Sequence, residues 1–185
     1  MSKKRLFLIS FLLTTGGMLL VMYLGQRKPG EVPDLTLLTN GVFVTSQLKP
    51  SAVGSLKARG IRTIVDFRPD GEAADQTPSS VIESLSKDDG MAFHYIPVPH
   101  ESIPDEAVHA LRDVLSQGAT PTVLYCRSGK RAARTFALAV ASQTDGPDLN
   151  QILGMVRAAG FSADDLKLNI AERISQRSSS PTSKN

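Results

Sequence analysis

Cysteine is nearly absent from this sequence, which contains a single Cys among 185 residues. One cysteine cannot form an internal disulfide, and it cannot supply a structural zinc site, which needs several thiolates. Tryptophan is absent, and aromatic residues make up only 5% of the chain. The net charge of +3 is mild, and no basic stripe is interleaved with aromatic residues. We therefore expect no nucleic-acid partner.

Charged residues are missing from 6 to 24, directly after a basic N-terminus formed by residues 1–5. A helix over this run nearly spans the hydrocarbon core of a bilayer. We predict an uncleaved transmembrane anchor over 6–24; the alternative is a cleaved signal peptide, although no clear cleavage site follows. The basic residues before the run favour a cytoplasmic N-terminus. The following domain would then lie outside the membrane, in the periplasm of a Gram-negative bacterium.

The rest of the chain alternates predicted strands and helices. A Pro/Gly linker covers 25–34, a domain follows over 35–175, and a polar tail that we expect to be disordered covers 176–185. The predicted strands are 41–48, 61–67, 91–98 and 120–126. The predicted helices are 49–60, 78–90, 104–117 and 130–143, with a closing helical pair over 148–175. Strands joined by helical crossovers predict an α/β domain of three layers, with a mostly parallel central sheet flanked by helices.

The only cysteine, Cys126, ends an apolar strand and is followed by a short loop and a helix, in the segment VLYCRSGKRAA. Ligands bind at the carboxyl ends of strands in such sheets. Amides of a tight loop and a helix N-terminus attract oxyanions and stabilise a thiolate. Gly129 allows the loop a positive φ, and Arg131 can donate two hydrogen bonds to a phosphate. These neighbours favour a reactive thiol over the other interpretation, a buried core cysteine.

Three segments carry a resemblance to a known family. VLYCRSGKRAA, GVFVTSQLKPSAVGSLKARGIRTIVDFRPDGE and FHYIPV resemble the phosphatase-like domain of beta-lactamase-hydrolase-like proteins, which is related to dual-specificity and tyrosine phosphatases. The resemblance spans 35–168 and implies the cysteine-phosphatase fold. It also implies hydrolysis of a phosphate monoester through a phosphocysteine, without metal or other cofactor. Cys126 would be the nucleophile and Arg131 the phosphate clamp. The implied phosphate-binding loop consists of Arg127, Ser128, Gly129, Lys130 and Arg131.

The sequence departs from tyrosine phosphatases at two positions of this loop. Four residues separate Cys126 from Arg131, whereas tyrosine phosphatases have five; four is also the loop length of rhodanese sulfurtransferases. The residue after the arginine is Ala132. Tyrosine phosphatases usually have Ser or Thr there, and its hydroxyl helps the thiolate leave. We therefore expect hydrolysis of the phosphocysteine to be slow.

The sequence offers several candidates for the general acid of the expected site. In related phosphatases an Asp protonates the leaving oxygen from a loop after the IPV strand, and that loop here is PHESIPDE. His100 and Glu101 lie nearest the expected place, and either can donate a proton. Asp105 starts a helix, where a carboxylate is favoured by the helix dipole alone. Asp70, in RPDG, fits a turn but could approach the site from a neighbouring strand end.

Three functions fit these observations. The first is a membrane-anchored phosphatase of the protein-tyrosine or dual-specificity type, acting on a phosphorylated substrate that the sequence does not identify. The second is a rhodanese-like sulfurtransferase that carries a persulfide on Cys126. The third is a binder of phosphate or phosphoproteins without turnover, which Ala132 and the unassigned acid leave open.

Overall fold

The computed structural model describes residues 33–118 and 121–179. The chain divides into two compact units, Met1–Gly30 and Glu31–Asn185, and all described residues belong to the second. The predicted basic N-terminus, the anchor, most of the linker and the end of the predicted tail lie outside the described residues. Within the described ranges, no helix is both long and apolar enough to cross a membrane.

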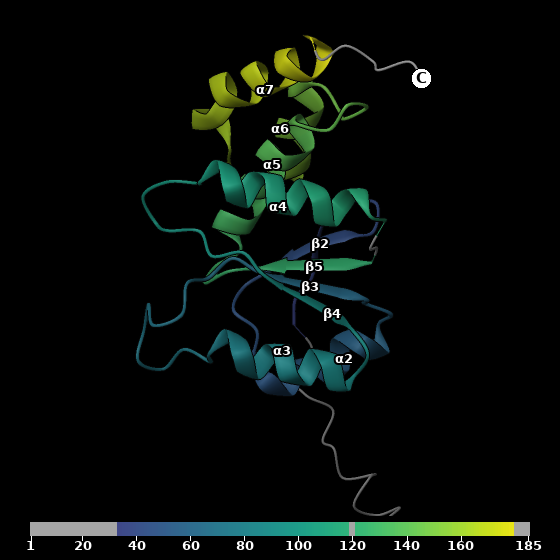
Figure 1. Ribbon diagram of the computed structural model, residues 1–185, viewed down its shortest axis with the longest axis vertical. Coiled ribbons are helices and arrows are strands. Elements are labelled where there is room, and N and C mark those ends of the chain that lie inside the picture. The colour runs from purple at the N-terminus through teal and green to yellow at the C-terminus, as the bar shows by residue number, and fades with distance from the viewer. Residues whose placement is uncertain (1–32, 119–120, 180–185) are drawn as a thin grey trace, which may run out of the picture. The chain divides into compact units, whose positions relative to one another are not determined.

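Five strands form one sheet at the centre of the second unit (Figure 1). In spatial order they are β1 (Thr36–Thr39), β2 (Val42–Thr45), β5 (Thr122–Tyr125), β3 (Thr63–Asp66) and β4 (Ala92–Tyr95). β2, β5, β3 and β4 run parallel, and β1 pairs antiparallel with β2 at one edge. The predicted mostly parallel sheet is confirmed. Every residue of the central strands β3 and β5 is buried, because helices cover both faces.

The edge strand β1 was not expected from the sequence. Thr39 pairs with Val42, so Asn40 and Gly41 form a two-residue hairpin turn. Gly41 has a φ of 74°, in the region that favours glycine. An Asn-Gly pair between two strand-like segments, here LLT and VFV, is a strong hairpin signal. The sequence therefore did contain the information for this strand.

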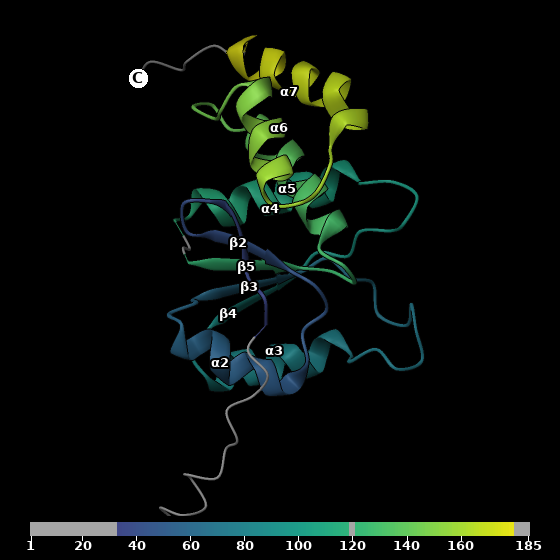
Figure 2. The same ribbon diagram turned by 180° about the vertical axis from the view of Figure 1, so that it is seen from behind.

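Helices form a layer on each face of the sheet (Figure 2). One layer holds α2 (Val53–Ala58), preceded by the 3-10 turn η1 (Pro50–Ala52), and α3 (Ser79–Asp88). The other holds α4 (Asp105–Ser116) and α5 (Lys130–Ala141), with α6 (Leu149–Ala158), η2 (Asp164–Leu166) and α7 (Lys167–Ser179). The predicted helices are confirmed, and α7 continues four residues beyond the predicted end at 175.

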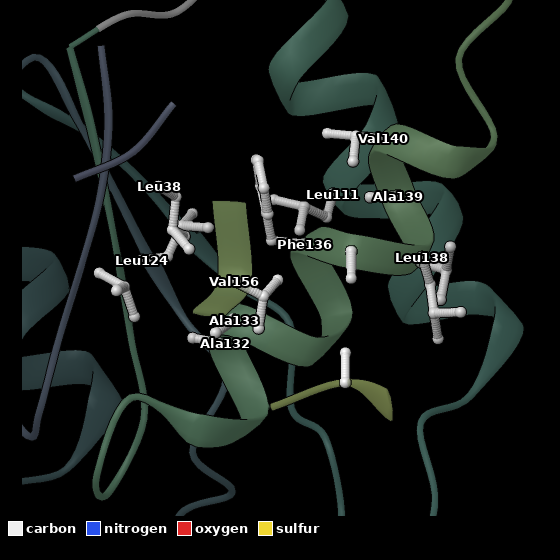
Figure 3. Close-up of a cluster of buried hydrophobic side chains, with 14 of the residues drawn as sticks. Leu38, Leu111, Leu124, Ala132, Ala133, Phe136, Leu138, Ala139, Val140 and Val156 are labelled. Atoms are coloured by element: carbon white, nitrogen blue, oxygen red, sulfur yellow. The ribbon is translucent and has the colours of Figure 1, made fainter. Parts of the chain in front are cut away.

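Helix α5 lies inside its layer, in contact with α4, α6 and α7 (Figure 3). All of its residues from Arg131 to Ala141 are buried except Arg134. Ala132, Ala133 and Phe136 belong to the same buried cluster as Leu124 of β5. Small alanine side chains let the neighbouring helices approach closely and pack densely. The start of α5, where Cys126 and Arg131 are placed, is therefore held by packing.

Candidate active site

Cys126 follows β5 directly, and the loop from Cys126 to Gly129 leads into α5. Gly129 has a φ of 86° and is the N-cap of this helix. A Cβ atom on Gly129 would lie 2.8 Å from the ring of Phe161 and 3.3 Å from the carbonyl oxygen of Thr45. Both the conformation and the space at this position therefore require glycine. Cys126 is a free thiol and is only 1% exposed.

Arg131 is a charged group that interacts with Cys126. Its side chain is buried, and Nη1 and Nη2 donate to the two carboxylate oxygens of Glu72 at 2.5 and 2.8 Å. Nη1 also donates to the carbonyl oxygen of Val98 at 2.7 Å. Burial lowers the pKa of Arg131, but the bonds to Glu72 and the charge and hydrogen bonding of Cys126 outweigh it and raise the pKa overall. Arg131 stays charged beside the sulfur.

A guanidinium has five N–H groups. Glu72 and Val98 take three of those on Arg131. The two that remain are on Nε and Nη2, which share one edge of the guanidinium. This edge can donate two parallel hydrogen bonds to two oxygens of one phosphoryl group. Glu72 therefore fixes the orientation of Arg131 without using the edge that an oxyanion needs.

Glu72 is a site residue that the sequence analysis missed. It lies in the loop between β3 and α3, with its side chain 17% exposed, and also accepts a 3.0 Å bond from Nε of Arg68. The bonds from Arg131, more than those from Arg68, lower the pKa of Glu72 to about 2, although burial works against this shift. A signal was available: RPDGE places a carboxylate four residues after Arg68, a spacing at which the two side chains can pair.

Of the candidate acids, His100 is the one that lines a hollow together with residues of the Cys126 loop. His100 and Arg131 both line a hollow of about 320 Å³, which we call the cationic hollow; its lining residues are His100, Arg127, Ser128, Lys130, Arg131, Arg134 and Asp165. The positive charge of His100 also contributes to lowering the pKa of Glu72. Glu101 and Asp105 line an adjacent hollow of about 330 Å³, which His100 and Arg131 share. Asp105 forms an ion pair with Arg173.

Asp70 holds the start of α3. Its carboxylate accepts hydrogen bonds from the backbone N–H and the hydroxyl of Ser79, at 2.8 and 2.6 Å. Its own N–H donates to the hydroxyl of Tyr95 at 2.8 Å. These bonds account for both oxygens of Asp70, so we leave this residue out of the proposed reaction.

A second carboxylate that the sequence analysis did not single out is buried beneath the same loop. Asp66, at the end of β3, accepts 2.7 and 2.8 Å hydrogen bonds from the Tyr125 hydroxyl and the Arg68 N–H. Burial raises the pKa of Asp66 to about 6, although both hydrogen bonds oppose the shift. Burial and the neighbouring Asp66 also raise the pKa of Tyr125. The pair braces the adjacent ends of β3 and β5.

Two other hollows, of about 420 and 440 Å³, are larger than the cationic hollow. The first is lined by residues 33–34, 45–49 and 52, and the second by residues on α4 and just after α5. Neither is lined by Arg131 or by a residue of the Cys126 loop, so we place the site at the cationic hollow. In the described ranges, no group of three or more His, Cys, Asp or Glu side chains is arranged to hold a metal ion.

The fold and the loop define a phosphatase-like α/β domain. A candidate phosphatase from Neisseria meningitidis superposes with a TM-score of 0.64 at 24% identity, covering 75% of this chain and 96% of that one. A kinase-associated phosphatase, studied with its catalytic-site cysteine replaced by serine, superposes with a TM-score of 0.62 at 14% identity, covering 84% and 100%. At these identities the likeness shows the fold alone.

The family follows from the sequence itself. The model of the beta-lactamase hydrolase-like protein, phosphatase-like domain, matches residues 34–143, and the chain belongs to this family. A beta-lactamase hydrolase-like protein of Xylella fastidiosa is 30% identical over 80 residues, which are 43% of this chain and 19% of the relative. The match thus spans about a fifth of that relative. The expected family is confirmed.

Proposed function

We propose that this protein is a cysteine-dependent phosphatase that hydrolyses a phosphate monoester. The observation that carries the proposal is that Glu72 holds Arg131 beside Cys126, while Glu72 and Val98 leave the Nε–Nη2 edge of the guanidinium for an oxyanion. This edge and the amides of the Cys126 loop would stabilise the charge on the transferring phosphoryl group. The family, whose model describes a phosphatase-like domain, supports the same reaction.

The reaction has two steps. The Cys126 thiolate forms a bond to phosphorus while the bond from phosphorus to the leaving oxygen breaks, and His100 gives that oxygen a proton. Water then attacks the phosphocysteine, His100 takes the proton from the water, and phosphate leaves as the thiolate is restored. We assign His100 rather than Glu101 as the acid because His100 lines the cationic hollow with Arg127 and Ser128 of the Cys126 loop, and Glu101 does not. The mechanism requires neither metal nor other cofactor.

The first test is hydrolysis of para-nitrophenyl phosphate by the full-length chain. We expect Cys126→Ser and Arg131→Ala each to lower kcat/KM by about 1000-fold or more. Thiosulfate with cyanide is the second arm, because a sulfurtransferase would form thiocyanate. Thiocyanate without phosphate release would make Cys126 a sulfur carrier. Tight binding of orthophosphate with neither product would favour a binder.

The acid is tested by changing the leaving group. A poor leaving group such as phenoxide needs a proton more than para-nitrophenoxide does. We expect His100→Asn to slow the phenyl phosphate reaction more than the para-nitrophenyl phosphate reaction, and Glu101→Gln to slow both equally. The reverse pattern would transfer the role to Glu101.

We also propose that residues 6–24 attach the protein to a membrane with the domain outside the cytoplasm. The uncharged run and the basic residues before it support this proposal. Retention of the chain in membranes after extraction at alkaline pH, and loss of retention on deleting 6–24, would test the attachment. Protease access to the domain in spheroplasts would test its side.

A further inference from the structure

Positive charge at the start of α5 exceeds what one phosphoryl group requires. Arg127, Lys130, Arg131 and Arg134 fall within eight residues, and the first turn of α5 contains no acidic residue. Cations are unfavourable at a helix N-terminus, where the backbone already carries partial positive charge. Lys130 and Arg134 are also like charges four residues apart, which repel on a helix surface. A sequence that breaks local rules in this way does so most often where a ligand binds.

Two of these cations have different counterions. The side chain of Glu72, which holds Arg131, is only 17% exposed. Arg134 donates from Nη1 and Nη2 to the two oxygens of Asp165 at 2.6 and 2.7 Å, and Asp165 is 63% exposed. The bonds from Arg134 lower the pKa of Asp165 against a small effect of burial. Exposed ion pairs contribute little to stability, so an incoming anion can compete with Asp165 for Arg134 at small cost.

The four cations share one hollow. Arg127, Lys130, Arg131 and Arg134 line the cationic hollow with His100, and Asp165 is its only carboxylate lining residue. Its volume of about 320 Å³ lies at the lower end of the range for small-molecule sites. The hollow therefore fits a compact, multiply charged ligand.

Donor geometry separates the cations into two groups. Arg131 and the loop amides are sufficient for one phosphoryl group. Lys130 and Arg134 lie four residues apart, about 6 Å along the helix, and so on the same side of α5. They can bind a second anion next to the first. We propose that the substrate is a small phosphate monoester with a second phosphate or carboxylate group, which Lys130 and Arg134 bind. This inference rests on the proposed function only for the first phosphate.

The test measures binding, so it does not depend on turnover. Alkane bisphosphonates with two to six methylene groups are titrated into the full-length chain by calorimetry at about 0.15 M salt, beside the matching monophosphonates. A bisphosphonate has two identical ends, so statistics alone make its affinity twofold higher than that of its monophosphonate. We expect one chain length to bind at least about tenfold tighter than its monophosphonate, because the second group gains charge-assisted hydrogen bonds.

Three variants assign the second site. Arg134→Gln should reduce the preference for the bisphosphonate to the statistical value, and Asp165→Asn should increase it by removing the competing carboxylate. Arg112→Gln is the control, because it removes the same charge from α4, outside the cationic hollow, and should leave the preference unchanged. Lys130→Gln, at an exposed residue, repeats the test if Arg134→Gln does not fold.

Either of two results would overturn the inference: equal affinity, beyond statistics, for mono- and bisphosphonates at every length, or a preference that persists in the folded Arg134→Gln or Lys130→Gln variant. Hydrolysis of para-nitrophenyl phosphate without a bisphosphonate preference would reject this site and keep the phosphatase. A bisphosphonate preference without any phosphatase activity would keep this site and reject the phosphatase.

Discussion

The loop after β5 and the loop after β3 leave neighbouring strands and meet at Arg131, yet they contribute different parts of the site. The first loop is short, contains Cys126, and leads directly into a buried helix. The second loop, residues 67–78, contributes Arg68 and Glu72, which form ion pairs. In the proposed function, the first loop would perform the chemistry, while the second loop orients Arg131 through Glu72. Substitutions in the first loop should therefore lower stability and kcat/KM more than substitutions in the second loop.

Two glycines test this difference most strongly, because both have positive φ. Gly129, in the first loop, has a φ of 86° and Gly71, in the second, has 81°. An added Cβ meets Phe161 and Thr45 at Gly129, but meets nothing within 4 Å at Gly71. We expect Gly71→Ala to cost about 1 kcal/mol from backbone strain alone. Gly129→Ala should cost about 2–3 kcal/mol and lower kcat/KM about 100-fold.

Urea unfolding and para-nitrophenyl phosphate kinetics on the two variants measure both effects. Since the strain at φ is common to the two glycines, the difference between them reports the close contacts at Gly129. If Gly129→Ala and Gly71→Ala lose equal free energy of unfolding and equal kcat/KM, the first loop is no more constrained than the second.

Glu72→Gln tests the orienting role of the second loop. Glutamine keeps the shape of the side chain but loses the charge that holds the Arg131 fork. We expect kcat/KM to fall about ten- to hundredfold through misorientation of Arg131, less than for Arg131→Ala. Glu83→Gln is the matched control, because Glu83 forms an exposed ion pair with Lys87 on α3.

Kinetics alone do not separate orientation from folding, so orthophosphate binding is measured as well. Loss of the ionised carboxylate should lower the unfolding midpoint of Glu72→Gln at neutral pH. A misoriented Arg131 should in addition weaken orthophosphate binding by the variant that stays folded. If Glu72→Gln binds orthophosphate more tightly than the wild type, Glu72 competes with the substrate instead of orienting its ligand.

Ala132→Ser tests whether the first loop is complete. Ala132 is fully buried and occupies the position where tyrosine phosphatases have a hydroxyl. If hydrolysis of the phosphocysteine is slow, the wild type should release a burst of para-nitrophenol before a slower steady rate. A serine hydroxyl that stabilises the leaving thiolate should raise the steady rate about fivefold and shrink the burst. Stopped-flow absorbance measures both phases, and a wild type without a burst would contradict the expectation.

The sequence predicted the parts of the site that lie close together in the chain. The cysteine, Gly129 and Arg131 fall within six residues, and their order along a strand, loop and helix was sufficient to expect an anion-binding loop. Glu72 was missed because its partner Arg131 is 59 residues away. Asp165 was missed for the same reason, since only the packing of α7 against α5, and of η2 against α7, brings it to Arg134. Counterions depend on tertiary contacts that a single sequence does not reveal.

The smallest expected effect is a difference in how two carboxylates respond to pH. Glu72 has a lowered pKa, about 2 against 4.5, so its contribution to stability is present above pH 4.5 and is lost as the pH falls towards 2. Asp66 has a raised pKa, about 6 against 3.8. Its folded form binds a proton more tightly than the unfolded form, so stability falls as the pH rises from 4 to 6.

Because the two carboxylates respond to pH in opposite directions, their combined contribution to stability should have a maximum at an intermediate pH. The contribution of the two carboxylates to the free energy of unfolding should rise as the pH falls from 7 to about 4.5 and decline below that. Asp66→Asn should remove the rise and Glu72→Gln the decline, in urea unfolding series from pH 7 to 3. Asp75→Asn, at an exposed position of the same loop, is the control and should follow the wild type. Ionisation of Glu72 stabilises the folded protein, whereas ionisation of the buried Asp66 destabilises it. Only Glu72 also contacts Arg131, so only Glu72 would link the pH dependence of stability to the residue that we propose binds phosphate.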